Sequence, residues 1–285
     1  MSSAPEYPEP RPELLAGTVD LHIHSAPDIF PRLVTAISAA EEAKRYGMAG
    51  IVVKSHSTDT AARAETARDA TDFPVFGGVV LNYPVGGLNE YAVLETARQG
   101  GRIVWMPTIN ARHFINNSAG GGMLAEAIPP GVSGLTAVDD GEVNAAALRV
   151  LDMVAQHDLT LATGHLHPDE SLVLVPEAFR RGVKRVIVTH PHLPFVGMPP
   201  DTAKKLGEAG AYIEVTEHES IEERVKMIRT VGADRCFLST DGGTVSAPAP
   251  VVRLSASIAA LLDQGFSEEE VRHMSATIPS YLVGL

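Results

Sequence analysis

The sequence of 285 residues contains a single cysteine, Cys236, so no disulfide can form within the chain. This cysteine usage is typical of a reducing compartment, and we expect a cytoplasmic protein. No apolar run approaches the roughly 20 residues that a membrane-spanning helix needs, which argues against a membrane protein. Basic residues are few and the formal net charge is −12, which argues against a nucleic-acid partner and leaves a small molecule as the expected one.

The beginning of the chain lacks the pattern of a signal peptide. Four prolines among polar residues within 1–13 predict an extended N-terminal arm over residues 1–15. Residues 16–285 are long enough for a single domain with a large core. The chain also has no Gly-x-Gly-x-x-Gly between its first strand and first helix, which argues against an open sheet that binds a dinucleotide.

What the sequence does contain is a regular alternation of short apolar runs and helical patterns. Eight apolar runs are each followed by a segment with helical periodicity, as a parallel sheet buried on both faces requires. This alternation predicts an α/β fold, a (β/α)₈ TIM barrel, with an open doubly wound sheet as the alternative. The rhythm breaks after the fourth strand, where the glycine-rich segment 109–142 predicts a lid-like insertion with a hairpin turn at Asp139-Asp140-Gly141.

The predicted strands repeatedly end in residues that can bind a metal. Five of the 11 histidines fall at strand ends, where a barrel places its active site. The first strand ends in Asp20-Leu21-His22-Ile23-His24, whose alternation directs His22 and His24 to one face. The later strands contribute Lys54, His56, His165, His190, Glu214 and Asp241.

These residue types predict a metal centre. Neutral imidazoles and one carboxylate suit a divalent metal, first of all Zn²⁺, with Mn²⁺ and Fe²⁺ as alternatives and one or two ions per site. The expected ligands are His22, His24, His165, His190 and Asp241. Such a metal lowers the pKa of water towards ~7, and a neighbouring carboxylate can take the proton and return it to a leaving group. Asp241, followed by two glycines that allow close approach of the chain, is the expected proton shuttle.

This constellation resembles the amidohydrolase superfamily. The resemblance rests on His22-x-His24, His165, His190 and Asp241 in this order, and on a C-terminal Ile278–Leu285 that is similar to the superfamily's NPA-x-x-LGL ending. It covers almost the whole chain, and within the superfamily it is closest to an uncharacterised group of predicted metal-dependent hydrolases. The resemblance implies hydrolysis of a C–N, C–O or P–O bond of a small molecule. Barrels of this kind often form homo-oligomers, an expectation by analogy only.

The sequence departs from this superfamily at the fourth strand. Binuclear members usually carry a lysine or glutamate there that bridges two metals, whereas this strand ends in Trp105-Met106-Pro107. Lys54 could bridge from the second strand, but we expect it to orient an anionic group of the substrate, with a solvated lysine at the barrel rim as the alternative. His56 and Glu214 are expected to bind substrate, with metal binding as an alternative for both. A carboxylate hydrogen-bonded to Lys54 or to a histidine is the further alternative for Glu214. With one metal bound, His190 would orient the attacking water rather than ligate.

Three other functions fit parts of the pattern. A phosphoesterase of the polymerase-and-histidinol-phosphatase type shares the opening motif but usually has Thr-Asp-His where this chain has Lys54-Ser55-His56. A decarboxylase related to the amidohydrolases uses one metal, two first-strand ligands, a histidine and an aspartate, without a fourth-strand lysine. A barrel that only binds a ligand is the third, but it would not need to keep all five candidate ligands.

Overall fold

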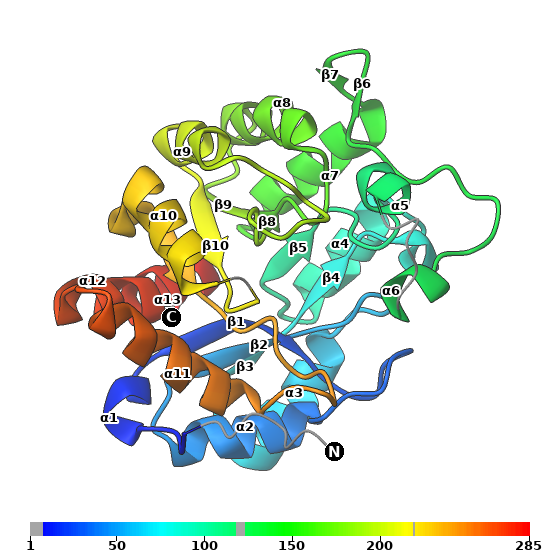
Figure 1. The fold of residues 1–285 in the computed structure, drawn as a ribbon. Coiled ribbons are helices and arrows are strands. Elements are labelled where there is room, and N and C mark those ends of the chain that lie inside the picture. The colour runs from blue at the N-terminus through cyan, green and yellow to red at the C-terminus, as the bar shows by residue number, and fades with distance from the viewer. Residues whose placement is uncertain (1–7, 118–122, 219) are drawn as a thin grey trace.

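The computed structural model describes residues 8–117, 123–218 and 220–285, and it shows an α/β fold built from parallel strands and surrounding helices (Figure 1). No helix in these residues is long and apolar enough to cross a membrane. The parallel strands are β1 (Val19–His24), β2 (Gly50–Lys54), β3 (Val75–Phe76), β4 (Gly78–Val80), β5 (Ile103–Trp105), β8 (Thr160–Ala162), β9 (Arg185–Val188), β10 (Tyr212–Val215) and β11 (Cys236–Leu238).

These strands form two parallel sheets. One has the order β1-β2-β3 and the other the order β11-β10-β9-β8-β5-β4. The third strand expected from the sequence is thus divided into β3 and β4 at Gly77, where a side chain would collide with the backbone of Thr60. The hydroxyl and backbone N–H of Thr60 both donate to the carbonyl of Gly78. A residue of the preceding loop, and not a neighbouring strand, therefore forms these hydrogen bonds with Gly78.

At the other edge of these sheets, the end of β1 lies beside the chain that follows β11. Ile23 and Gly242 form an isolated parallel bridge, in which the N–H of His24 donates to the carbonyl of Gly242 at 2.8 Å. Gly243 has a φ of 104°, and a side chain there would collide with the carbonyl of His24. Glycine is therefore required where the last strand's loop passes the first strand.

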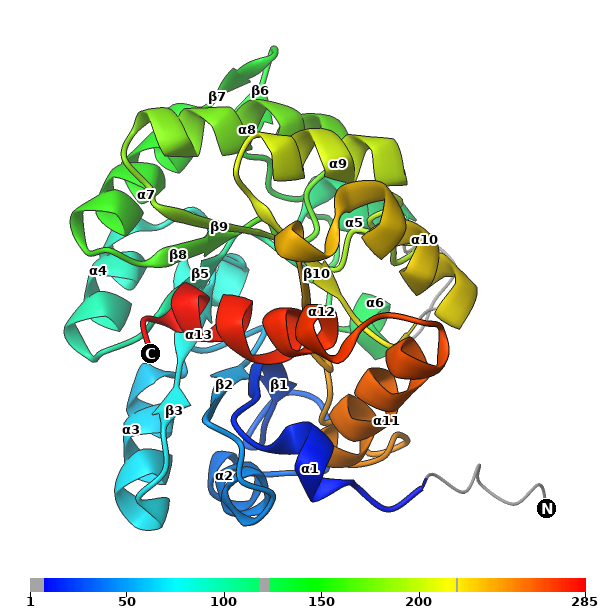
Figure 2. The ribbon, with the colours of Figure 1, turned by 90° about the vertical axis from the view of Figure 1, so that its left-hand side faces the viewer.

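Helices pack around the strands, and their bounds agree with the helical patterns of the sequence to within a few residues (Figures 1 and 2). Side chains cap several of them: the Asn144 and Ser220 oxygens accept from backbone N–H groups in the first turns of α7 and α10. The helices that follow the strands are α2 (Ala36–Arg45), α3 (Ala61–Thr71), α4 (Glu90–Arg98), α7 (Ala145–Gln156), α8 (Pro168–Arg180), α9 (Pro200–Glu208), α10 (Ile221–Val231) and α11 (Pro250–Asp263).

The C-terminal segment packs across the amino ends of the strands (Figure 2). It consists of α12 (Glu268–Arg272), a π-helical turn (His273–Thr277) and α13 (Ile278–Val283). Ile278 and Leu282 of α13 join an apolar cluster with Val19, Ile103 and Phe237 from the strands. The C-terminal segment therefore covers the amino ends of the strands.

Two segments differ from the expectation. Residues 1–15 were expected to be extended, but Pro12–Leu15 form a short helix, α1, because Leu15 is fully buried in the core. The segment 109–142 contains α5 (Arg112–Asn117), α6 (Met123–Glu126) and an antiparallel pair, β6 (Val138–Asp139) and β7 (Glu142–Val143). The expected turn is present, with Asp140 and Gly141 at positive φ.

Candidate metal centre

Three candidate ligands converge where the strands end at their carboxyl side. One ligand atom each from His22, His190 and Asp241 lies within 4.8 Å of the other two. His22 comes from β1, His190 follows β9 and Asp241 follows β11. The backbone φ values of His190 (23°) and Asp241 (45°) lie in the left-handed region, where non-glycine residues are uncommon. Strained backbone of this kind often occurs at functional sites.

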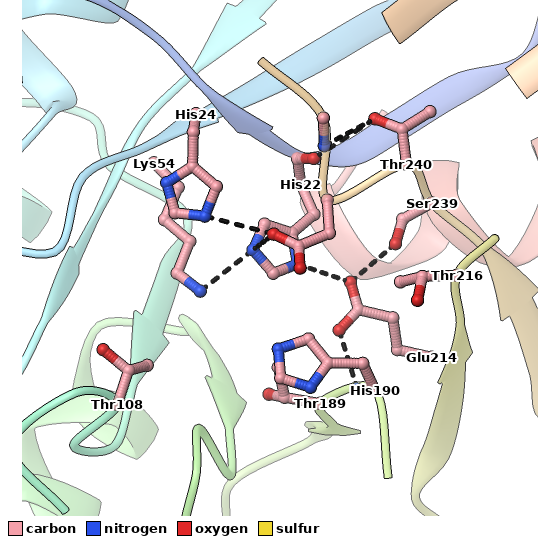
Figure 3. A network of polar contacts seen from close by, with 12 residues as sticks. His22, His24, Lys54, Thr108, Thr189, His190, Glu214, Thr216, Ser239 and Thr240 are labelled. Atoms are coloured by element: carbon pink, nitrogen blue, oxygen red, sulfur yellow. Dashed lines mark hydrogen bonds and ion pairs between the residues drawn. The ribbon is translucent and has the colours of Figure 1, made fainter. Parts of the chain in front are cut away.

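Asp241 is the hub of the polar contacts that reach His22 and His24, whose side chains are labelled in Figure 3. Its Oδ1 lies 2.9 Å from Nε2 of His22 and 3.1 Å from Nε2 of His24, and its Oδ2 lies 3.4 Å from Nε2 of His218. Burial acts to raise the pKa of Asp241, but the positive charge of His22 and the hydrogen bonds from these histidines outweigh it. The pKa of Asp241 therefore lies well below its usual value, and the carboxylate is ionised at neutral pH.

Glu214 on β10 orients His22 from behind. The Nδ1–H of His22 donates to Glu214 Oε1 at 2.8 Å, while the Ser239 hydroxyl and the backbone N–H of His190 also donate to this carboxylate, at 2.6 and 2.9 Å. Burial acts to raise the pKa of Glu214, but His22 and the hydrogen bonds lower it to about 2. Glu214 thus contacts protein groups, as in the alternative of a carboxylate hydrogen-bonded to a histidine, and its role towards a substrate stays a prediction.

Lys54 occupies an unusual position for a lysine. Its side chain is buried, and Nζ lies 2.9 Å from Nε2 of His22 and 5.2 Å from the centre of the Trp105 ring. Burial lowers the pKa of Lys54 to about 8, although Asp241 and Glu214 act against this. Burial also acts to lower the pKa of His22, but Asp241 and Glu214 raise it to about 9.

The donor set fits a divalent metal ion. Nδ1 of His22 donates to Glu214, and its Nε2 lies between Oδ1 of Asp241 and Nζ of Lys54, at 2.9 Å from each. The Nδ1 atoms of His165 and His190 are buried and have no hydrogen-bond partner among the described residues. Burial lowers the pKa of both imidazoles well below the usual value, so they are neutral, as metal ligands must be.

The other two expected ligands lie at the same site but outside the compact cluster. His165 packs its ring 5.1 Å from that of His190, centre to centre. His24 receives a hydrogen bond on Nδ1 from Nη2 of Arg32 at 3.2 Å, so in this arrangement its Nε2 carries a proton towards Asp241. Ligation by His24 and His165 therefore stays a prediction.

His56 lies at the edge of this centre. Its ring stacks on that of His24 with centres 4.7 Å apart, and its Nδ1 lies 2.8 Å from the Thr108 hydroxyl oxygen. The fourth strand of the sequence pattern is β5 in the structure, and Trp105-Met106-Pro107 at its end continues into Thr108 without a lysine or an acidic residue. Thr108 is also hydrogen-bonded to Asn82.

A cavity of about 480 Å³ opens above the centre. Its lining includes most of the expected site residues, among them Lys54, His56 and Asp241. A second cavity of about 580 Å³ lies between α1, α11 and α12, towards the opposite end of the strands, and contains none of the candidate ligands. The candidate metal ligands therefore lie at the first cavity and not at the second.

Sequence reasoning missed three residues at this site. Arg32 and His218 lie in loops after β1 and β10, where no strand pattern marks them. Asp20 was seen in the opening motif but given no role. Its carboxylate accepts from the hydroxyl and backbone N–H of Thr240 at 2.5 and 3.1 Å, which fixes the chain just before Asp241. The alternation of β1, which directs Asp20 inward with His22, was the signal available for this contact.

A family profile described as a family of unknown function, DUF6282, matches residues 17–214. The chain belongs to this family. The match covers β1 to β10 and includes each of the expected site residues except Asp241. No curated protein matches the sequence significantly.

Solved structures with a similar fold include enzymes of the amidohydrolase superfamily. A 2,6-dihydroxybenzoate decarboxylase from Rhizobium is 14% identical, with a TM-score of 0.58 and coverage of 94% of this chain and 99% of that one. An amidohydrolase from Pseudomonas aeruginosa is 12% identical (TM-score 0.61, coverage 96% and 99%), and a probable dipeptidase from the same organism is 10% identical (TM-score 0.60, coverage 95% and 96%). The resemblance inferred from the sequence is thus confirmed at the level of the fold.

Proposed function

We propose that this protein is a metal-dependent hydrolase that cleaves a C–N or C–O bond of a small amide, lactone or ester. The observation that carries the proposal is the compact cluster of His22, His190 and Asp241, with Glu214 holding His22 from behind. The similar amidohydrolase and dipeptidase structures support it. We also propose that the strands form a closed (β/α)₈ barrel, since the bridge between Ile23 and Gly242 joins the first strand to the last.

One divalent ion, first of all Zn²⁺, would be held by His22, His190 and Asp241. When bound, such an ion acts as a Lewis acid that polarises a carbonyl and lowers the pKa of water towards neutrality. Glu214 keeps the proton of His22 on Nδ1 and so presents Nε2 to the ion. The second cation at the site, Lys54, lies beside His22 and would have to move or lose its proton when the ion enters.

The chain's own groups can handle the proton transfers. Asp241 is ionised at neutral pH and lies at the floor of the cavity, so it can accept a proton from water and return it to the leaving group. His165 lines the cavity opposite, with a buried Nδ1 that has no partner among the described residues. The 109–142 segment contributes Leu124 to the cavity wall, which supports the proposed role of this segment as a lid that excludes water.

The first test is the metal content of protein purified without chelator. We expect about one divalent ion per chain, since the three donor atoms surround a single point. The double variant His22→Ala/His24→Ala should lose the metal while its far-ultraviolet circular dichroism stays close to that of the wild type. His157→Ala/His273→Ala, which removes two histidines that do not line this cavity, should keep it. Full metal content in the first double variant would reject the site.

The second test separates the chemistry from metal binding. Asp241→Asn should keep at least part of the metal but lower turnover on the order of 10²- to 10⁴-fold, because the amide cannot accept the proton. The measurement is acid or alcohol release from a panel of amides, lactones and esters, with CO₂ release followed in parallel. Unchanged turnover in this variant would remove Asp241 from the mechanism, and CO₂ as the product would replace hydrolysis by decarboxylation.

A further inference from the structure

The cavity above the metal centre has a charge opposite to that of the protein as a whole. Its lining contains one carboxylate, Asp241, against the side chains of Arg32 and Lys54 and five imidazoles. The complete chain carries a formal net charge of −12. A divalent ion at the centre would increase this local positive charge further. A cationic cavity in an acidic protein favours a substrate that carries a negative charge.

Arg32 is the residue best placed to bind such a charge. Its guanidinium lines the cavity although only 3% of the side chain is exposed. Nε donates to Asp28 Oδ2 at 2.8 Å and Nη2 donates to His24 Nδ1 at 3.2 Å, while Nη1 makes no hydrogen bond to the described residues. A guanidinium with a free edge towards a cavity is a typical receptor for a carboxylate or a phosphate.

The loop that carries Arg32 is fixed in place. The backbone of Arg32 forms a bridge with Thr244, and the N–H of Leu33 donates to the carbonyl of Gly243 at 2.8 Å. Both partners belong to the loop that follows Asp241, so the guanidinium and the proposed proton shuttle are held by one local framework. A preorganised guanidinium loses little conformational entropy when it binds an anion.

Asp28 does not cancel the charge of Arg32 completely. The same carboxylate also accepts from the backbone N–H of Ile29 at 2.7 Å and attracts Arg63, whose pKa is lowered by burial and raised by Asp28. Asp28 therefore orients the guanidinium through Nε and leaves Nη1 without a hydrogen bond to the described residues. This free edge of Arg32 can bind a second anion.

Another part of the cavity lining is apolar. It contains Leu124, Leu193, Pro194 and Phe195, and the Phe195 ring lies 4.7 Å from that of His165, centre to centre. Cavities of ~300–1,000 Å³ with an apolar lining and a few polar groups are typical of small-molecule sites, and this one has about 480 Å³. A ring or branched chain can pack against Phe195 while a charged group reaches Arg32.

We propose that the substrate is a small amphipathic anion whose carboxylate or phosphate binds Arg32 and whose apolar part packs against Phe195. Such an anion would be the substrate class of the proposed hydrolase. The binding itself does not depend on the proposed function, but the reaction that follows binding does. Arg32 thus acts in specificity, because a neutral analogue would leave its guanidinium without a partner in a cavity that has lost its water.

The test uses probes rather than an unknown substrate. Binding of benzoate, phenyl phosphate and neutral benzyl alcohol to the metal-loaded protein is measured by isothermal titration calorimetry. We expect at least one anion to bind more than about tenfold more tightly than benzyl alcohol, as charge-assisted hydrogen bonds allow. The stronger of the two anions identifies the group that the site prefers. Equal binding of all three probes, or no binding of any, overturns the proposal.

Variants then assign the binding to Arg32. Arg32→Gln/Asp28→Asn removes the pair without leaving a buried charge, and should weaken binding of the preferred anion about tenfold or more. Arg149→Gln/Glu90→Gln removes a more exposed arginine–carboxylate pair between α4 and α7, away from the cavity, and should change nothing. Asp28→Asn alone frees the guanidinium and should preserve or strengthen binding. Arg32→Lys, which keeps the charge and is the least disruptive change, should weaken binding severalfold by losing the planar fork.

Chelation separates this proposal from the proposed function. Binding that persists in metal-free wild-type protein and falls in the Arg32 variants supports the anion site whatever the metal does. Binding that disappears with the metal and is unchanged in the Arg32 variants would mean that the metal holds the anion, which overturns the role of Arg32 and supports the metal centre. If the purified protein contains no metal but its anion binding still depends on Arg32, the proposed hydrolase function is rejected and the anion site is kept.

Discussion

The two ends of the parallel strands differ in what their inward side chains do. At the amino ends, Val19, Ile103 and Phe237 form a dry apolar cluster that α13 covers. At the carboxyl ends, the same strands lead into His22, Lys54 and other ionisable groups that are equally buried. The same parallel strands therefore support a stabilising apolar core at one end and, a few residues further along, a polar site whose burial lowers the stability of the fold.

The polar end is stable because its charges are paired before any metal or substrate arrives. Asp20 is held by Thr240, and Glu214 by His22 and Ser239. A buried ionised group without such partners would destabilise the fold by several kcal/mol. The apolar end has no such requirement and contributes through burial and packing alone.

The largest expected effect on stability is at the apolar end. Phe237 is fully buried on β11, and Phe237→Ala should lower the free energy of unfolding by about 3–5 kcal/mol, because it removes a large side chain and leaves a cavity. Metal content per folded chain should stay at the wild-type value. The measurements are urea unfolding and elemental analysis of the folded fraction. Loss of metal in the folded variant would show that the two ends are not independent.

A smaller effect is expected at the polar end, and it should appear in metal affinity. Glu214→Gln keeps the shape of the side chain but removes the charge that orients His22, so the affinity should fall about 10- to 100-fold. Competition with a chelator of known affinity measures it. Ser239→Ala, which removes only one donor to Glu214, serves as the milder control. An unchanged affinity in Glu214→Gln would mean that His22 is oriented without this carboxylate.

The sequence predicted the parts of the site that strands carry. His22, His190 and Asp241 each lie in or after an apolar run, and the parallel strands bring such carboxyl ends together. Arg32 could not be found in this way, because it lies in a loop whose position depends on a distant bridge to Thr244. The surroundings of Glu214 could not be predicted for a related reason, since only the packed structure shows that three donors contact its carboxylate.

The secondary structure likewise depends partly on local sequence signals and partly on contacts with residues that are distant in the sequence. Helix bounds follow from periodicity and caps such as Asn144 and Ser220, which are local signals. The break of the third strand at Gly77 depends on Thr60, a residue from the preceding loop, and the helical turn Pro12–Leu15 depends on a place for Leu15 in the core. Neither cause is visible in the segment that it reshapes.

The smallest predicted effect is on the pH dependence of stability, and it concerns Cys236, at the start of β11. Cys236 begins β11 at the apolar end, and burial raises the pKa of its thiol above the usual value of 9.0, whereas Asp241 after β11 is held ionised. The unfolded chain loses the thiol proton above pH 9 and the folded chain keeps it, so this residue's contribution to stability is present below pH 9 and is lost as the pH rises.

Cys236→Ala should therefore remove a small part of the alkaline loss of stability. Between pH 8 and pH 10, the unfolding free energy of the wild type should fall about 1.4 kcal/mol further than that of the variant, one pKa unit of linkage. Urea unfolding at both pH values measures the difference, and the thiol of the folded wild type should not react with a thiol reagent until the chain unfolds. Parallel pH curves for the two proteins, or rapid labelling of the folded one, would place Cys236 in contact with water and end the contrast between the dry and the charged ends.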